Sequence, residues 1–298
     1  MVEQVSLTDY YNFKVIDRYS DRELLREWQL IKDGNYGYNS KSSWNKLIRT
    51  FQFYEFYKHE LDMWNKNEPY QGLPLRSWIY ANRKKYIGKG YGELTQAEIL
   101  RAFKISGIHI GYSFHSPFYI KQFIKDYNIK SIYDPCGGWG HRMLGAAAAN
   151  CEYSYNDINI NTYKGCVNMQ KFLGFSTWMY NNNAADFTPS ENYEAVFTCP
   201  PYHNVEVYTR FGAENLNYEA FLDWWKLVVH KSCIVKDSCK YFAFVINKTY
   251  EKDMSQVCKD AGLQQISNTL LGSSSSRSHL NSANSKKEER LLVFIKGN

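Results

Sequence analysis

From residue 131 onward, short apolar segments typical of buried strands are separated by segments with a different pattern. The expected strands cover 131–135, 152–157, 176–181, 193–198, 240–246, 264–271 and 290–296. Helical periodicity follows most of them, but a polar tract rich in Ser and Asn joins the last two. This alternation predicts an α/β fold, with a doubly wound, mostly parallel seven-stranded sheet that ends in an antiparallel hairpin.

The turn after the first expected strand is rich in glycine and has the sequence DPCGGWG (134–140). Such turns bind nucleotides in α/β folds because glycine lets a ligand approach the backbone closely. Met143 replaces the third glycine of the dinucleotide fingerprint, and a phosphate-binding Gly-Lys-Ser/Thr is missing. Asp134 would repel a pyrophosphate but suits an ammonium group, which favours S-adenosylmethionine as the cofactor. The candidate cofactor contacts of this turn are Asp134, Cys136, Gly137, Gly138 and Gly140.

Two more acids follow expected strands. Asp157 ends the second strand, where an acid accepts hydrogen bonds from ribose hydroxyls in folds of this class. Asp186 follows the third strand and could bind the amino group of an adenine. Each acid alone is more readily explained as a helix cap. Together with Asp134, they predict one crevice at the carboxyl edge of the sheet.

The sequence CPPY (199–202) directly follows the fourth expected strand. A Pro-Pro pair fixes the backbone and leaves carbonyl groups without partners in the sheet. Those carbonyls could accept hydrogen bonds from an amino group, and Tyr202 could stack on a planar base. A purely structural turn is the alternative explanation for this motif on its own.

The two motifs together resemble those of S-adenosylmethionine-dependent amino methyltransferases that act on nucleic-acid bases. DPCGGWG is similar to the first motif of that family, and CPPY is similar to its catalytic motif, (Asp/Asn/Ser)-Pro-Pro-(Tyr/Phe/Trp). Residues 113–117 resemble the segment that closes over the methionine end of the cofactor, which adds Ser113 and His115 as implied cofactor contacts. The resemblance covers about 110–298 and implies a Rossmann-like, class I methyltransferase fold.

The resemblance also implies a reaction, the in-line transfer of a methyl group to cytosine N4 or adenine N6 of a flipped base. The implied catalytic residues are Cys199, Pro200, Pro201 and Tyr202. Cys199 departs from the family pattern, because a thiol is a weaker acceptor than Asp, Asn or Ser. Since Cys is closest to the Ser of the cytosine group, cytosine N4 in DNA is favoured. Methylation of an RNA base, and an inactive fold that only binds nucleic acid, are the alternatives.

The positive charge of the chain is concentrated in its first part. Residues 1–130 contain 20 Lys and Arg and 14 Asp and Glu, whereas residues 131–298 contain 16 of each kind. The whole net charge of +6 therefore lies before residue 131. We expect a small, basic helical domain at 1–108, which would grip nucleic acid, and a methyltransferase domain at 109–298.

Basic and aromatic residues alternate between Arg76 and Lys104, as they do on nucleic-acid-binding surfaces. A helix face with extended Lys and Arg side chains gives a similar pattern. The candidate nucleic-acid contacts are Arg83, Lys84, Lys85, Lys89, His203 and Arg277.

The remaining composition limits cofactors and location. Seven cysteines without a C-x-x-C pair favour reduced thiols over disulfides, and the His and Cys spacing does not predict a metal site. Apolar segments stay shorter than the ~18 residues of a membrane span, and Met1–Gln4 does not start a signal peptide. The sequence therefore predicts a cytoplasmic protein without membrane contact, and it leaves the oligomeric state open.

Overall fold

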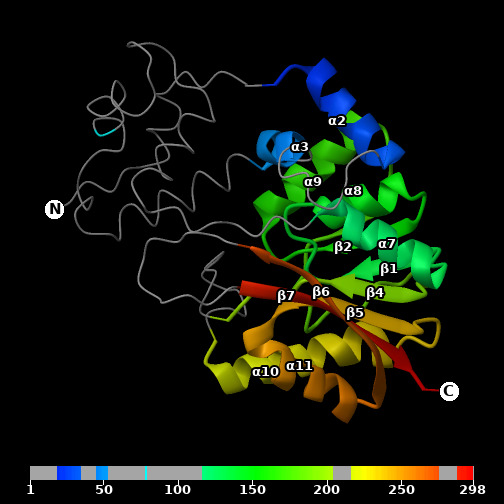
Figure 1. Cartoon of the computed structure of the whole chain (residues 1–298), viewed down its shortest axis with the longest axis vertical. Coiled ribbons are helices and arrows are strands. Elements are labelled where there is room, and N and C mark those ends of the chain that lie inside the picture. Colours follow the sequence, from blue (N-terminus) through cyan, green and yellow to red (C-terminus); the bar gives the residue numbers. More distant parts are fainter. Residues whose placement is uncertain are drawn as a thin grey trace.

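A seven-stranded sheet forms the centre of the fold in the computed structural model (Figure 1). The described residues are 19–34, 45–52, 78, 116–203, 216–274 and 287–297. The strands are β1 (Ser131–Asp134), β2 (Glu152–Asn156), β3 (Trp178–Tyr180), β4 (Ala195–Thr198), β5 (Tyr241–Asn247), β6 (Leu263–Ser274) and β7 (Lys287–Lys296). The helices are α2 (Asp21–Asp33), α3 (Asn45–Phe51), α7 (Pro117–Tyr127), α8 (His141–Ala148), α9 (Ile160–Leu173), α10 (Tyr218–Val229) and α11 (Lys248–Asp260). A π-helical turn, His230–Ile234, extends α10.

The strand order confirms the predicted fold class. The order is β3-β2-β1-β4-β5-β7-β6, with β1 to β5 parallel and β7 antiparallel between β5 and β6. The chain moves outward from β1 to β3 and then returns to place β4 on the other side of β1. Ligands of doubly wound sheets bind at such a switch point, outside the carboxyl ends of the strands.

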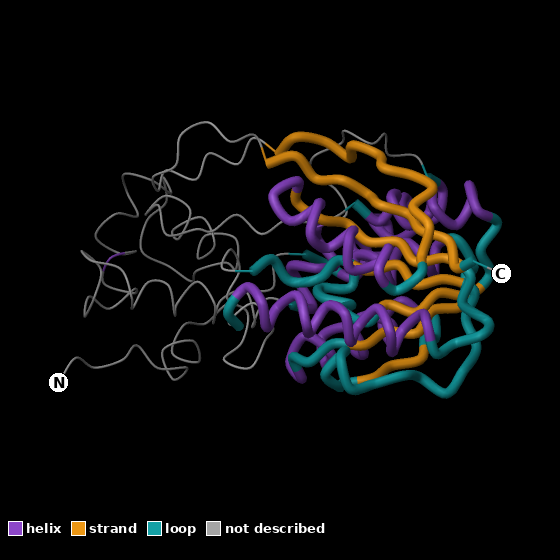
Figure 2. The backbone as a smooth tube through the Cα atoms, turned by 90° about the horizontal axis from the view of Figure 1, so that it is seen from below, coloured by secondary structure: helices purple, strands orange, loops and turns teal. Residues whose placement is uncertain are grey.

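Helices cover both faces of the sheet (Figures 1 and 2). The first apolar core packs α7, α8 and α9 against one face, and the second packs α10 and α11 against the other. Strand β4 is buried along its whole length because it lies between the two cores. This explains why its sequence, AVFT, lacks the polar alternation of a strand with one exposed face.

The described part of the predicted N-terminal domain belongs to the first core. Ser20 and Glu23 form a capping box that starts α2. Apolar side chains of α2 and α3 are buried together with those of α7, α8 and α9. The ring of Trp28, for example, lies 5.4 Å from that of Phe175. A domain boundary at residue 108 is therefore wrong for these two helices, and the rest of 1–108, apart from residues 19, 20, 34, 52 and 78, lies outside the described residues.

A glycine inside α9 allows α3 to approach closely. A Cβ atom on Gly165 would lie 2.5 Å from Oε1 of Gln52 and 2.7 Å from the carbonyl oxygen of Phe51. Gln52 is buried, and its Nε2 donates to the carbonyl of Thr162 over 3.0 Å. Glycine costs about 1 kcal/mol in a helix interior, so this position is explained by the contact.

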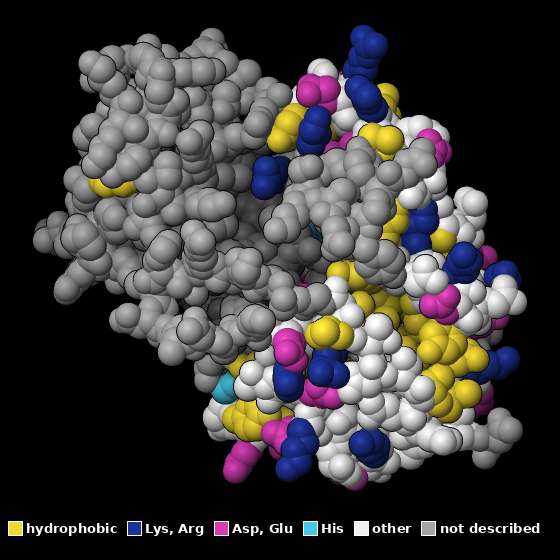
Figure 3. Space-filling view, in the orientation of Figure 1, with side chains coloured by type: hydrophobic (Ala, Val, Ile, Leu, Met, Phe, Trp, Pro, Cys, Tyr) yellow, Lys and Arg dark blue, Asp and Glu magenta, His cyan; other side chains and the backbone are white. Residues whose placement is uncertain are grey.

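The surface of the described part carries mixed charges. Figure 3 shows Lys and Arg interspersed with Asp and Glu over the coloured part of this face, without a broad patch of one sign. Among the described helices, none is long and apolar enough to cross a membrane.

Candidate functional site

The glycine loop (residues 134–140) lies at the carboxyl ends of β1 and β2. Gly138 and Gly140 have φ angles of +57° and +91°, which L side chains rarely adopt. The loop is tied to the end of β2, because the amide of Gly137 donates to the carbonyl of Asn156 over 2.7 Å. The loop thus forms a tight turn between β1 and α8, and its contact with a cofactor stays a prediction.

Tyr155 of β2 packs against the glycine loop and is hydrogen-bonded to it. Its hydroxyl donates to the carbonyl of Gly138 over 2.8 Å. A Cβ atom on Gly137 would lie 2.1 Å from the Tyr155 ring, and one on Gly140 would lie 2.6 Å from the side chain of Met169. The loop therefore needs glycine for close packing as well as for its backbone conformation.

Asp157 contacts the glycine loop directly. Its Oδ2 accepts from the amide of Gly138 and its Oδ1 from the amide of Asn159, each over 2.8 Å. Asn159, rather than Asp157, caps α9, which removes the alternative explanation for this acid. Burial raises the pKa of Asp157 to about 6, although the two backbone hydrogen bonds oppose the shift. A half-buried carboxylate at this position can accept hydrogen bonds from ribose hydroxyls.

Asp134 does not face a ligand, contrary to the prediction. Its side chain is 0 % exposed, and its Oδ2 accepts from Nε of Arg142 and from the hydroxyl of Tyr153, each over 2.5 Å. Its Oδ1 accepts from the hydroxyl of Thr198 over 2.8 Å and from the amide of Cys136 over 3.1 Å. A carboxylate offers about four acceptor positions, and these bonds use them. We call these five residues the Asp134 network.

Arg142 supplies the counter-charge inside this network. It lies in the first turn of α8 and is buried, and it also donates to the carbonyl of Cys136. Burial acts to lower the pKa of Arg142, but Asp134, Tyr153 and Cys199 together outweigh this effect, so the pKa is raised. Burial raises the pKa of the Cys136 thiol, which Asp134 and Asp157 raise further. Cys136 therefore enters the site as a neutral thiol.

The proline loop (residues 199–202) starts at the end of β4, across the switch point from the glycine loop. Cys199 and Pro201 are half-buried, whereas Pro200 and Tyr202 are buried. The Tyr202 ring stacks on that of Tyr250 with centroids 6.3 Å apart, and its hydroxyl donates to Glu289 over 3.4 Å. One face of Tyr202 is thus turned toward another ring, and its stacking on a base stays a prediction.

His203 is not available for nucleic acid in this arrangement. It is 7 % exposed, and its ring lies 5.4 Å from that of Tyr218. Its Nε2 lies 2.8 Å from the carbonyl oxygen of Leu216, and its own carbonyl accepts from Tyr250. The predicted contact is wrong because these groups already satisfy the imidazole within the second core.

Asp186 lies at the same edge of the sheet but is exposed. Its Oδ2 accepts from Nδ2 of Asn183 over 2.7 Å, and its contact with an adenine stays a prediction. The other predicted contacts lie outside the described residues, namely Ser113, His115, Arg83, Lys84, Lys85, Lys89 and Arg277.

Sequence reasoning missed several residues that hold the site together. The sequence patterns place Arg142, Tyr155 and Thr198 only in a helix or in strands, yet each makes a side-chain contact to the glycine loop. Asn156 is also buried, and its Nδ2 donates to the carbonyls of Pro135 and Asn182. A polar side chain at the end of a buried strand was the available signal, because such a group needs a buried partner.

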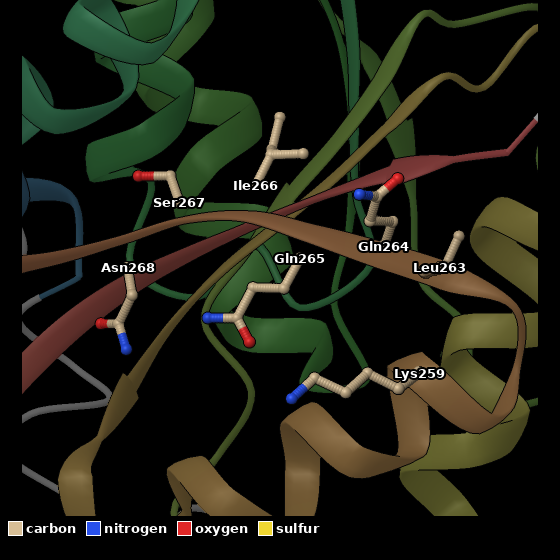
Figure 4. A pocket seen from close by; sticks show the side chains of 7 residues that line it. All are labelled: Lys259, Leu263, Gln264, Gln265, Ile266, Ser267 and Asn268. Atoms are coloured by element: carbon tan, nitrogen blue, oxygen red, sulfur yellow. The ribbon is translucent and has the colours of Figure 1, made fainter.

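A hollow of about 530 Å³ lies along β6, at the edge of the sheet farthest from β3 (Figure 4). Gln265 and Asn268 point to the side of Lys259, whereas Ile266 points the opposite way. A bulge between Gln265 and Ser267 interrupts the strand pairing here. The hollow is separated from β4 by two strands, so it is distinct from the crevice. In the part of the chain that the structure describes, His, Cys, Asp and Glu do not cluster as a metal site would require.

No family model and no curated protein matches the sequence. An S-adenosylmethionine-dependent methyltransferase from Clostridium acetobutylicum aligns at 9% identity and a TM-score of 0.45, covering 75% of this chain and 99% of that chain. The human methyltransferase 10 domain containing protein aligns at 9% identity and a TM-score of 0.45, covering 74% and 96%. Magnesium protoporphyrin IX methyltransferase from Synechocystis was solved with bound S-adenosylmethionine. It aligns at 11% identity and a TM-score of 0.42, covering 76% of this chain and 98% of that chain. Because these identities are near one in ten and the TM-scores lie below 0.5, we infer the activity from this chain's own residues.

Proposed function

We propose that this protein transfers a methyl group from S-adenosylmethionine to an exocyclic amine of a nucleic-acid base. The observation that carries this proposal is the placement of the glycine loop and the proline loop on opposite sides of the β1–β4 switch point. A methyl donor on one loop and an amine on the other would meet in a single crevice. When bound, S-adenosylmethionine supplies an electrophilic methyl group on its sulfonium.

The crevice residues fit this cofactor. The tight glycine loop would let the cofactor approach the backbone closely, and the carboxylate of Asp157 would accept from the two ribose hydroxyls. Ile158, directly after Asp157, is 42% exposed and offers an apolar surface for one face of the adenine. Asp186 would accept from the adenine amino group.

The proline loop fits the amine. The lone pair of the amine nitrogen is delocalised into the base. Acceptors that bind the hydrogens of the amine make its nitrogen more nucleophilic. The carbonyl of Pro200 is the stronger of the two acceptors in the loop, because the thiol of Cys199 accepts hydrogen bonds weakly. Holding the amine in line with the methyl group supplies much of the rate gain in such transfers.

We propose DNA as the substrate, with cytosine N4 favoured over adenine N6, because Cys199 is closest to the Ser of the cytosine group. The base would be flipped out of the duplex to reach the proline loop. Stacking on Tyr202 would use the face of the ring turned away from Tyr250.

The test incubates the protein and labelled S-adenosylmethionine with duplex DNA, single-stranded DNA and RNA, followed by nucleoside analysis. N4-methylcytosine in DNA is the expected product, whereas a methylated RNA nucleoside would replace the DNA assignment. Pro201→Ala and Tyr202→Ala should abolish transfer while cofactor binding persists, and Cys199→Ser should retain it. Full activity in the first two variants would refute the site. If millimolar S-adenosylmethionine does not raise the Tm of the wild type, the methyltransferase assignment fails.

A further inference from the structure

Thr198 lies where the backbone pairing between β1 and β4 stops. The paired residues are Ile132 with Ala195 and Tyr133 with Val196. Two residues beyond Val196, the Thr198 hydroxyl donates to Oδ1 of Asp134 over 2.8 Å, and its side chain is 0% exposed. A buried side-chain hydrogen bond thus continues the connection between the strands beyond their last paired residues.

This hydrogen bond joins the two loops of the crevice. Asp134 is the first residue of the glycine loop, and Thr198 directly precedes the proline loop. The carboxylate is itself held from α8 by Arg142 and from β2 by Tyr153. Because a carboxylate paired with an arginine only accepts hydrogen bonds, the Thr198 hydroxyl must be the donor. The carboxylate of Asp134 therefore holds the Thr198 hydroxyl in one position.

We infer that Thr198 is a positioning residue for the proposed methyl transfer. Through Asp134, it fixes the Pro200 carbonyl relative to a cofactor on the glycine loop. The inference rests on the proposed function, and it assigns Asp134 to the alignment of the two loops instead of to cofactor binding. Displacing reacting groups by about 1 Å can lower a rate by about 100-fold, so a single hydrogen bond at this place has a measurable effect.

Two substitutions separate the hydroxyl from the volume of the side chain. Thr198→Val removes the hydroxyl and keeps the branched shape, whereas Thr198→Ser keeps the hydroxyl. We expect Thr198→Val to lower the single-turnover rate by about tenfold or more, with an unchanged Kd for S-adenosylmethionine. Thr198→Ser should stay near the wild-type rate. Equal rates for Thr198→Val and the wild type, or equal losses in both variants, would overturn the inference. Thr198→Ala replaces the valine variant if the latter does not fold.

Hydrogen exchange in the cofactor-free protein tests the same connection without activity. The amides of Cys199, Tyr202 and His203 report on the proline loop, because proline lacks an N–H group. We expect these amides to exchange faster in Thr198→Val than in the wild type and Thr198→Ser. Unchanged exchange in all three proteins would contradict the coupling. If the wild type transfers no methyl group, the proposed function fails, and faster exchange in Thr198→Val alone would still establish the connection between the loops.

Discussion

The affinity for S-adenosylmethionine should fall as the pH drops through 6. Burial raises the pKa of Asp157 to about 6, against hydrogen bonds from the amides of Asn159 and Gly138. Ribose hydroxyls donate to the ionised carboxylate, so cofactor binding favours the form that has lost its proton. In the free protein, acid adds that proton and removes the acceptor.

The size of the effect follows from this pKa. If only the ionised form binds, the apparent Kd rises by a factor of 1 + 10^(pKa − pH). That factor is close to one at pH 8, about 2 at pH 6 and about 10 at pH 5, where the loss is about 1.4 kcal/mol. The affinity is thus close to its full value above pH 7 and falls progressively below pH 6.

Isothermal titration of S-adenosylmethionine between pH 5 and pH 8 measures this dependence. Asp157→Asn is the matched control, because it keeps the size of the side chain and removes its titration. We expect weaker binding by this variant above pH 7 and a flat profile from pH 5 to 7. A flat wild-type profile, or the same slope in both proteins, would refute the ribose contact of Asp157.

Two further changes test the support of the glycine loop. Gly137→Ala places a methyl group 2.1 Å from the Tyr155 ring, so thermal denaturation should show a loss of about 1–3 kcal/mol. Gly297→Ala is the control and should leave the Tm unchanged, because a Cβ at Gly297 meets no atom of the described residues within 4 Å. Arg142→Met leaves the carboxylate of Asp134 buried without its counter-charge and should cost about 3–5 kcal/mol in urea unfolding. Adding Asp134→Asn to that variant should recover part of the loss, and no recovery would contradict a charge effect.

The fold was predictable because its signals are local. Buried strands followed by glycine, proline or acidic residues marked the strand ends. The structure confirms the end at Thr198 and places the end of the first strand at Asp134, one residue before the predicted end. The parallel order and the final antiparallel pair also followed from the alternation of segments. The predicted strand lengths were less accurate. Strand β6 continues beyond its apolar residues to Ser274, and β7 already begins at Lys287, before its apolar residues.

The roles of individual residues were harder to predict, because they depend on distant partners. Asp134 has the same local sequence whether it binds a ligand or a buried arginine. Its partners Arg142 and Thr198 are 8 and 64 residues away along the chain. His203 likewise gave no local sign that a carbonyl thirteen residues later would satisfy it.

The close contact between α3 and α9 determines where this chain can be shortened. A truncated protein starting at residue 109 would lose Leu47 and Ile48 and expose the apolar residues that they cover. It would also keep Gly165 in α9, although Phe51 and Gln52, whose close approach requires a glycine there, would be missing. We therefore expect a shortened protein that begins at residue 109 to aggregate.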